Sequence, residues 1–370
     1  MSLAQIEIQL VAVVVAVACA LPGTLLVLRR MAMMSDAVSH AILPGIVVGV
    51  LLVGSLHSPL LLVAAALTGL LTTVLVEALN DTGRVKEDAA IGIVFPVLFS
   101  VGVLLIAQFA SDMHLDTDAV LLGELAFAPF NRLLAFGYDL GPRALWTMSG
   151  VLLLNALVLG LFYKELKLAT FDPGLAASLG FRPRALHYAL MGLVSLTAVS
   201  AFDAVGSILV VALMVGPPVT AYLLTERLDR MMGLSAGIGT LNALLGYWGA
   251  HWLDASIAGA MATTTGLVFG AAVLGAPRRG LLAQWRRQRR QRWTFAEEVL
   301  AVHLRQHEDT PEAARECRID HLQEHLGWDA EHAERVVAHA VANGSVRREN
   351  GHLTLTDDGR AVAQEAATRT

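Results

Sequence analysis

Asp36 and His40 are the two residues whose types and spacing first indicate chemistry. They stand four apart in the stretch from Arg29 to Gly45, so on a helix they share one face. Apolar segments flank this stretch, and ionisable groups within or beside a bilayer are costly and commonly mark a pathway. A carboxylate oxygen with an imidazole nitrogen suits Zn(II), Mn(II) or Fe(II). The structural alternative is a helix-capping acid and a core histidine bonded to a backbone carbonyl.

The composition places this pair in a membrane protein. The chain has 370 residues, of which 55% are hydrophobic and 16% charged, whereas a soluble domain has roughly 25% charged residues. Residues 1–276 are mostly apolar blocks, and residues 277–370 are highly charged. Because residues 1–28 contain no Lys or Arg, we expect the first apolar run to be a retained span rather than a signal peptide. The predicted fold class is an all-α polytopic membrane protein with a C-terminal soluble domain.

Apolar stretches of ~20 residues predict eight or nine membrane-spanning helices, with nine as the preferred number. The nine segments lie near residues 8–28, 33–56, 59–79, 89–109, 145–163, 186–201, 205–224, 233–251 and 256–276.

Basic residues predict the orientation, because Lys and Arg stay on the cytoplasmic side of a membrane. In a nine-span count, the groups after spans one, three, five, seven and nine fall on one side; they include Arg29, Arg30, Arg84, Lys86, Lys164, Lys167, Arg182, Arg184, Arg227, Arg230, Arg278 and Arg279. We therefore expect the N-terminus outside and the C-terminal domain inside. The loop 110–144 would then face out, with Asp112, Asp116, Asp118, Glu124 and Asp139 against Arg132 and Arg143. Such an acidic mouth would concentrate cations, unless it is an ordinary solvated loop.

Two loops on the predicted inner side are candidate docking surfaces. Asp172 is a natural N-cap and Pro173 a natural first helical residue, so the segment ending at Gly180 predicts a short amphipathic helix. The second loop follows the Pro217-Pro218 pair and ends at Arg230. It contains Pro218, Tyr222, Glu226 and Arg227.

Six sequence blocks, in order along residues 1–276, resemble the inner-membrane permeases of manganese, zinc and iron-chelate ABC importers, the ABC-3 type. The blocks are SDAVSHAILPG at 35–45, EDAAIG at 87–92, LGE at 122–124, DPGLAASLG at 172–180, GSILVVALMVGPP at 206–218 and SIAGA at 256–260.

This resemblance implies a type II ABC importer permease. A second permease subunit, identical or different, would complete the pathway, a separate ATPase would dock on the inner loops, and an extracytoplasmic binding protein would deliver Mn, Zn or Fe at the bacterial inner membrane. Asp36 and His40 match the family's polar intramembrane positions, and Asp203 and Gly206 would lie at the outer gate. By position, Pro218 to Arg230 looks like the main ATPase contact, with Asp172 to Gly180 as the other loop.

The chain contains no Walker A motif, so it is not expected to supply an ATP site. As a transport subunit, it is expected not to be an enzyme and not to hold a permanent cofactor. A membrane-embedded enzyme built on Asp36, His40 and Asp203 is a second possibility, but the His-Glu-x-x-His arrangement it would want is absent. A membrane-anchored metal-responsive regulator and a proton-coupled secondary transporter are further alternatives. The ATP requirement of metal uptake separates them.

The tail begins with an Arg-rich juxtamembrane linker, residues 277–292, which is expected to contact anionic lipid. Residues 293–370 predict a cytosolic domain with helices near 294–307, 311–325 and 329–343. A hairpin of strands 345–348 and 352–356 follows, with its turn at 349–351. This pattern resembles the winged-helix domain of manganese- and iron-dependent repressors. DNA is an unlikely partner, because residues 293–370 hold fifteen acidic and eight basic residues.

Histidines in the tail suggest a metal sensor. His303 and His307 are four residues apart, as are His321 and His325, so each pair would share one helical face. The alternative is that these are solvated surface histidines.

Overall fold

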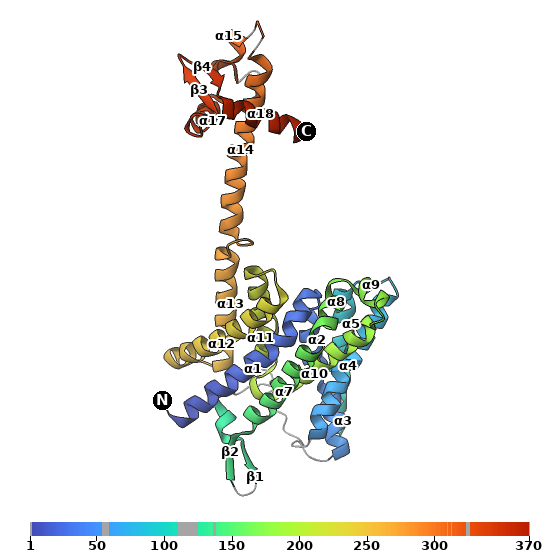
Figure 1. Cartoon of the computed structure of the whole chain (residues 1–370). Helices are drawn as coiled ribbons and strands as arrows, with labels where there is room; N and C mark the ends of the chain where they lie inside the picture. The colour runs from blue at the N-terminus through green and yellow to red at the C-terminus, as the bar shows by residue number, and fades with distance from the viewer. Residues whose placement is uncertain are drawn as a thin grey trace. The chain divides into compact units, whose positions relative to one another are not determined.

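A computed structural model describes residues 2–53, 59–109, 125–135, 138–308, 310–311, 313–322 and 326–369. The chain divides into two compact units, Met1–Gly280 and Leu281–Thr370, here called unit 1 and unit 2 (Figure 1).

Unit 1 is a helical bundle with one small hairpin. Its helices are α1 (Leu3–Leu28), α2 (Met33–Ala41), α3 (Leu43–Val53), α4 (Pro59–Asp81), α5 (Glu87–Phe109), α7 (Arg143–Leu161), α8 (Tyr163–Phe171), α9 (Pro173–Ser178), α10 (Pro183–Val205), α11 (Ser207–Leu224), α12 (Leu228–Leu253) and α13 (Ile257–Gly275). A 3-10 helix, η1 (Leu125–Phe130), precedes the antiparallel strands β1 (Arg132–Ala135) and β2 (Tyr138–Pro142).

Eight helical segments among the described residues are long and apolar enough to cross a membrane. They are Leu3–Leu28, Met33–Leu52, Leu60–Asp81, Glu87–Phe109, Arg143–Leu161, Pro183–Val205, Ser207–Leu224 and Ile257–Gly275. The ninth predicted segment, 233–251, does form a helix within α12, but α12 is not among these eight. Polar residues such as Asn242 and His251, with several glycines, dilute its apolar content.

Helix α1 lies at the centre of unit 1. It packs against α7, α10, α11 and α12, and most of its second half is buried. Gly23 permits the close approach of α11, because a Cβ at this position would lie 2.0 Å from the carbonyl oxygen of Met214. Small residues at such crossings let membrane helices pack by van der Waals contact. The same helix begins with a capping box between Ser2 and Gln5.

The two ends of unit 1 carry different features. The β1–β2 hairpin and the α8–α9 segment lie at opposite ends (Figure 1). Arg132 of β1 contacts Glu7 of α1 at 3.2 Å and also pairs with Asp139 of β2, so this arginine ties the hairpin to the first helix.

Unit 2 has its own hydrophobic core. Its elements are α14 (Leu281–His307), α15 (Ala313–Glu316), the 3-10 turn η2 (Ile319–His321), α17 (Ala330–Ala342), β3 (Val346–Glu349), β4 (His352–Leu355) and α18 (Asp357–Arg369). Buried side chains from α14, α17 and both strands form the core, including Leu300, Leu304, Val336, Val337 and Leu353.

The hairpin of unit 2 lies close to its predicted position: β3 begins and ends one residue later than expected, and β4 ends one residue earlier. Asn350 and Gly351 form its turn with φ of 51° and 83°. Positive φ at both central residues is the type I′ geometry that favours Asn-Gly. Helix α14 is longer than expected, because it starts at Leu281 instead of near residue 294. The Arg, Gln and Leu residues of 281–292 are good helix formers, so the predicted linker is helical here.

Candidate functional site

Asp36 and His40 lie on α2, one turn apart, as their spacing predicted. The Oδ1 atom of Asp36 is 3.4 Å from the Nε2 atom of His40. The His40 side chain is 31% exposed and that of Asp36 39% exposed, so both groups remain accessible from outside the chain. The ring of His40 also lies 6.1 Å from the ring of Phe95 on α5.

The local sequence explains why this pair faces outward. The opposite side of α2 is apolar, and Met34 and Ala37 are buried there against α4 and α5. The hydroxyl groups of Ser35 and Ser39 donate to the backbone carbonyls of Ala32 and Ser35, so they are satisfied within the helix. The helix ends at Ala41 and α3 begins at Leu43, which sets α2 apart as a short segment at one end of its span.

Two protein donors do not complete the coordination sphere of a divalent transition metal. In the described part of the chain, no group of three or more His, Cys, Asp or Glu residues is arranged to hold a metal ion. A metal at Asp36 and His40 would therefore take its further ligands from outside the described residues, from water or from another chain.

The predicted outer-gate residues lie at the junction of α10 and α11. Asp203 is exposed in the last turn of α10. Gly206 is the single residue between the two helices, with φ of 77° and ψ of 164°. A side chain would be strained at this positive φ, so the sharp junction depends on glycine.

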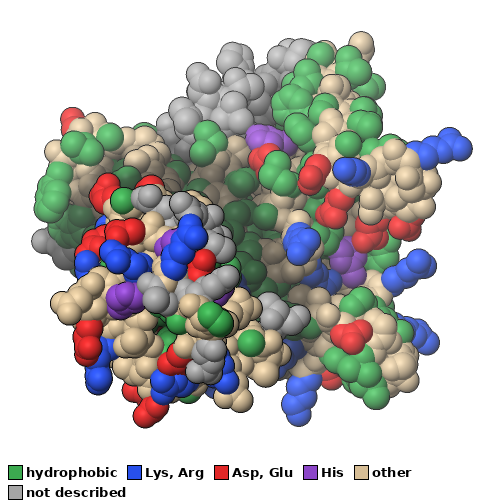
Figure 2. All heavy atoms as spheres, turned by 90° about the horizontal axis from the view of Figure 1, so that it is seen from above, with side chains coloured by type: hydrophobic (Ala, Val, Ile, Leu, Met, Phe, Trp, Pro, Cys, Tyr) green, Lys and Arg blue, Asp and Glu red, His purple; other side chains and the backbone are tan. Residues whose placement is uncertain are grey.

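The α8–α9 segment has the predicted short helix. The Asp172 side chain accepts a hydrogen bond of 2.9 Å from the backbone N–H of Leu175, and Pro173 opens α9. Gly180 follows the helix with φ of 86°, in the left-handed region that favours glycine. Four large apolar side chains of this segment are exposed: Phe171, Leu175, Leu179 and Phe181. Figure 2 views the molecule from the α8–α9 side, where charged side chains of both signs gather on unit 1.

The second predicted loop is only a three-residue turn, because α11 ends at Leu224 and α12 begins at Leu228. Pro218 is buried inside α11 and presents no surface to a partner. Tyr222 is exposed and lies under the guanidinium of Arg279, whose Cζ is 4.3 Å from the ring centroid.

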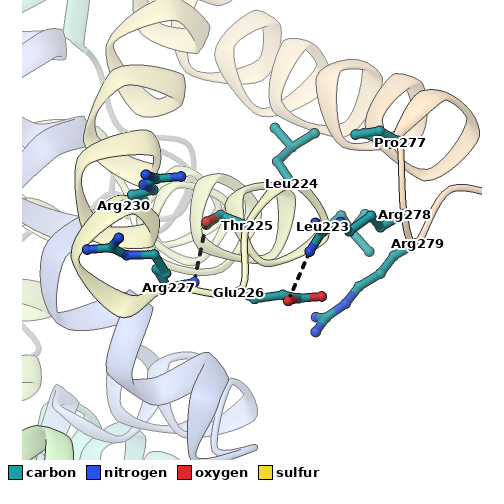
Figure 3. Close-up of a pocket in the computed structure, with 9 residues that line it drawn as sticks. All are labelled: Leu223, Leu224, Thr225, Glu226, Arg227, Arg230, Pro277, Arg278 and Arg279. Atoms are coloured by element: carbon teal, nitrogen blue, oxygen red, sulfur yellow. Dashed lines mark hydrogen bonds and ion pairs between the residues drawn. The ribbon is translucent and has the colours of Figure 1, made fainter.

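Charged groups of this turn line a cavity of about 420 Å³ with the segment after α13 (Figure 3). Glu226 pairs with Arg278 at 3.1 Å, and Arg227 pairs with Asp229 at 2.8 Å. The hydrogen bond from Arg227 lowers the pKa of Asp229. The cavity wall has one acidic residue, Glu226, against four basic ones, so the wall is basic overall; the four are Arg227, Arg230, Arg278 and Arg279.

A charged network at the α8–α9 end was missed by the sequence analysis. Arg29 follows α1, and its Nε donates to the Thr170 hydroxyl of α8 at 3.1 Å. Its Nη1 lies 3.2 Å from Nδ1 of His187 on α10. On the other side of the imidazole, Nε2 lies 2.5 Å from Oε1 of Glu77 on α4. Each residue lies at a helix end, but only the folded chain brings them together.

The predicted acidic outer mouth is described only in part. Asp112, Asp116, Asp118 and Glu124 lie outside the described residues. Asp139 is paired with Arg132, whose hydrogen bond lowers the pKa of the Asp139 carboxyl. This aspartate is therefore already neutralised by an arginine.

The tail histidines lie partly in the core of unit 2. His303 is 6% exposed, and its Nε2 is 3.2 Å from the carbonyl oxygen of Glu316. The ring of His307 is 4.6 Å from that of His303. Nδ1 of His321 lies 3.8 Å from a carboxylate oxygen of Glu316. His325 lies outside the described residues.

A family model of the ABC 3 transport family matches residues 5–275. The chain belongs to the ABC 3 transport family. This match contains α1 to α13, and with them Asp36, His40, the α8–α9 segment and the α11–α12 turn.

Individual ABC 3 relatives match over most of their length. The chain is 46% identical over 358 residues to the zinc transport system membrane protein TroD of Treponema pallidum (strain Nichols), covering 97% of both chains. It is 48% identical over 272 residues to the manganese transport system membrane protein MntD of Bacillus subtilis (strain 168), covering 74% of this chain and 92% of MntD. The TroD alignment thus includes most of unit 2 as well as unit 1.

A solved structure supports the fold. PsaBC from Streptococcus pneumoniae, in complex with a Fab, matches with a TM-score of 0.61 and 27% sequence identity. The match covers 74% of this chain and 92% of that one.

Proposed function

We propose that this chain is the membrane-spanning permease subunit of an ATP-driven importer of divalent transition metal ions. The observation that carries the proposal is the accessible Asp36–His40 pair on a membrane-spanning segment of an ABC 3 family chain. Ionisable side chains in membrane-spanning segments commonly mark a transport pathway, because placing them in the bilayer costs free energy. The relatives named for zinc, manganese and chelated iron transport define the class of cargo.

Asp36 and His40 would contribute two ligands to a transient metal site. A weak, incomplete site suits transport, because an ion must leave as readily as it binds. The open side of the pair would be completed by water or by a second permease subunit, which is either another copy of this chain or a different one. Asp203 and Gly206 would form part of the outer gate, at the opposite end of α10 from the basic loops.

The ATPase would dock mainly on the α8–α9 segment. Exposed Leu175 and Leu179 offer an apolar surface, and capping by Asp172 holds α9 in place. The α11–α12 turn, with Tyr222, Glu226 and Arg227, would give a smaller contact, because it has only three residues outside the helices. The sequence analysis instead made the loop from Pro218 to Arg230 the main ATPase contact. The α8–α9 segment replaces it here because Pro218 is buried and cannot reach a partner. Gly180 would let the chain turn back into α10.

The protein would span the bacterial inner membrane with the α8–α9 end and the tail in the cytoplasm, because Lys and Arg residues stay on the cytoplasmic side. An extracytoplasmic binding protein would deliver the metal at the hairpin end. The arginines of 277–292 would contact anionic lipid headgroups, as basic segments beside a membrane helix do.

Unit 2 would be a cytosolic winged-helix-like domain, since α14, α17 and the β3–β4 hairpin share one core. Its excess of acidic residues argues against DNA as its ligand. A metal-sensing role for His303, His307, His321 and His325 would need donors beyond the described residues, given that no three-residue cluster is found within them.

The test is metal accumulation in a bacterial strain that lacks its own manganese and zinc importers. Co-expression of this chain with its ATPase and binding protein should restore accumulation of radioactive Mn(II) or Zn(II) from chelator-treated medium. The same strain with Asp36→Asn should stay at background. Accumulation that is unaffected by removing this chain would contradict the proposal.

A further inference from the structure

Four side chains, one each from α4, α8 and α10 and one from the residue that follows α1, form a continuous polar connection at the α8–α9 end of unit 1, here called the polar chain. It runs from Thr170 on α8 through Arg29 and His187 to Glu77 on α4, with distances of 3.1, 3.2 and 2.5 Å between successive polar atoms. The His187 side chain is 14% exposed and that of Glu77 29% exposed, and Arg29 is half-buried. Removing a link would leave neighbouring polar groups without compensation.

The chemistry of the side chains decides which groups of the polar chain donate hydrogen bonds and which accept them. An arginine guanidinium donates hydrogen bonds and cannot accept them. Nδ1 of His187 must therefore accept from Arg29, so the proton of the neutral imidazole stands on Nε2, which makes a close polar contact with Glu77 without hydrogen-bond alignment. In this arrangement His187 is neutral with a fixed tautomer, held between a cation and a carboxylate.

The two ends of the polar chain contact different functional parts. Thr170 lies in the last turn of α8, two residues before Asp172, the capping residue of α9. Glu77 and His187 lie on α4 and α10, and both of these helices pack against α2. The contact is close: a Cβ added at Gly69 of α4 would lie 2.9 Å from Ser195 of α10 and 2.9 Å from Val38 of α2. Val38 lies between Asp36 and His40 in sequence. A shift of α4 or α10 would therefore displace Val38 and, with it, the Asp36–His40 pair.

We propose that the polar chain couples the α8–α9 segment to the Asp36–His40 pair, with Arg29, His187 and Glu77 as positioning residues. The inference rests on the proposed function, since it assumes metal at the pair. When α8 moves, Arg29 and His187 either keep or lose their contact, which gives the connection two distinct arrangements. Coupling between two sites is reciprocal, so metal at Asp36 and His40 must also alter α8–α9.

Hydrogen exchange measured on the full chain in lipid nanodiscs tests this reciprocity, with MnCl₂ as the probe. In the wild type, Mn(II) should slow amide exchange both in α2 and in residues 163–178. We expect a change of about fivefold or more in the second segment, the lower range of allosteric couplings.

The decisive variant is His187→Phe, which keeps a ring of similar shape but has no nitrogen atoms. It should retain the Mn(II) response in α2 and lose it in residues 163–178. Glu77→Gln, which keeps the side-chain size and a polar oxygen near Nε2, should keep most of the response. Arg29, Glu77 and His187 line a cavity of about 430 Å³ together with Asp81, which is not part of the polar chain. The matched control is Asp81→Asn, which removes a carboxylate from this cavity and should behave as wild type.

Each result bears on a separate claim. A His187→Phe protein that keeps the response in residues 163–178 overturns the coupling. A wild-type response in α2 without one in residues 163–178 overturns it as well and leaves the metal site intact. No response in wild-type α2 overturns the proposed metal site, and the coupling with it. The α2 response of each variant also shows that the variant is folded. Arg29→Gln interrupts the polar chain at a second position and should lose the response in residues 163–178, as His187→Phe does.

Discussion

Asp36 and His40 face each other across one turn of α2, with Oδ1 of the aspartate 3.4 Å from Nε2 of the histidine. Neither side chain is enclosed by its own chain, although both stand on a segment apolar enough to span a membrane. The apolar face of α2 is used for packing against α4 and α5, which leaves this polar face for an ion or a second subunit.

Replacing either member of the pair should stop transport without unfolding the protein. Asp36→Asn and His40→Gln keep side-chain size but weaken metal coordination, so we expect metal uptake to fall at least tenfold, a loss of about 1.4 kcal/mol or more in the transport barrier. Radioactive Mn(II) uptake and the amount of assembled complex should be measured together.

The matched control for this prediction is Asp254→Asn. Asp254 has φ of 50° at the end of α12, a conformation that Asn also tolerates. This variant loses a carboxylate elsewhere in unit 1 and should transport normally. Wild-type uptake by both pair variants would show that Asp36 and His40 have a structural role only.

Charging the apolar surface of the α8–α9 segment should uncouple the permease from its ATPase. Leu175→Asp and Leu179→Asp place carboxylates where apolar side chains are exposed. We expect co-purification of the ATPase to fall at least tenfold, since burying an unpaired charge at an interface is costly. Arg227→Gln in the α11–α12 turn should have a smaller effect. A larger loss from Arg227→Gln would make that turn the main contact.

The ion pair between Arg360 and Glu308 should make the stability of unit 2 depend on pH. The two contacts are 2.6 and 3.2 Å, and the hydrogen bond from Arg360 lowers the pKa of Glu308 below its usual 4.5. A lowered carboxyl pKa in the folded state stabilises the fold above the unfolded value, and this contribution is lost as the pH falls through the folded value.

Arg360→Gln should therefore reduce the free energy of unfolding of unit 2 at pH 7, and should reduce it by less at pH 3. Denaturant unfolding at both pH values measures the difference. Arg335→Gln is the control, because its contact with Glu331 is longer, at 3.8 Å, and exposed. An equal effect of Arg360→Gln at both pH values would exclude the ionised Glu308 as the cause.

His303 should stabilise unit 2 without any metal. Its ring is buried and contacts the Glu316 carbonyl, so His303→Ala should lower the free energy of unfolding by roughly 1–3 kcal/mol in chelator-treated protein. Thermal unfolding with chelator and with added Mn(II) or Zn(II) separates two roles. Destabilisation that is seen only with metal present would instead favour the sensor hypothesis.

Features set by neighbouring residues could be predicted from the sequence. Asp172 and Pro173 predicted α9, Asn350 and Gly351 predicted the hairpin turn, and the four-residue spacing predicted that Asp36 and His40 share a face. In each case the geometry follows from the backbone preferences of adjacent residues. The spanning helices were also found, except that polar residues keep α12 out of the apolar set.

Features that depend on distant residues could not be predicted. Arg29 and His187 are 158 positions apart, and Glu7 and Arg132 are 125 apart, so no local pattern joins them. Helices α1, α5 and α11 continue through Pro22, Pro96 and the Pro217-Pro218 pair, although proline commonly interrupts a helix. Membrane helices tolerate such prolines because neighbouring groups satisfy the freed backbone.

Metal uptake into proteoliposomes tests the central claim most directly. Vesicles that contain this chain with its ATPase, supplied with the binding protein and Mn(II), should accumulate the metal only when ATP is present on the ATPase side. Accumulation should vanish with Asp36→Asn, although the ATPase stays bound. Uptake by this chain without the ATPase, driven by a proton gradient alone, would contradict the account.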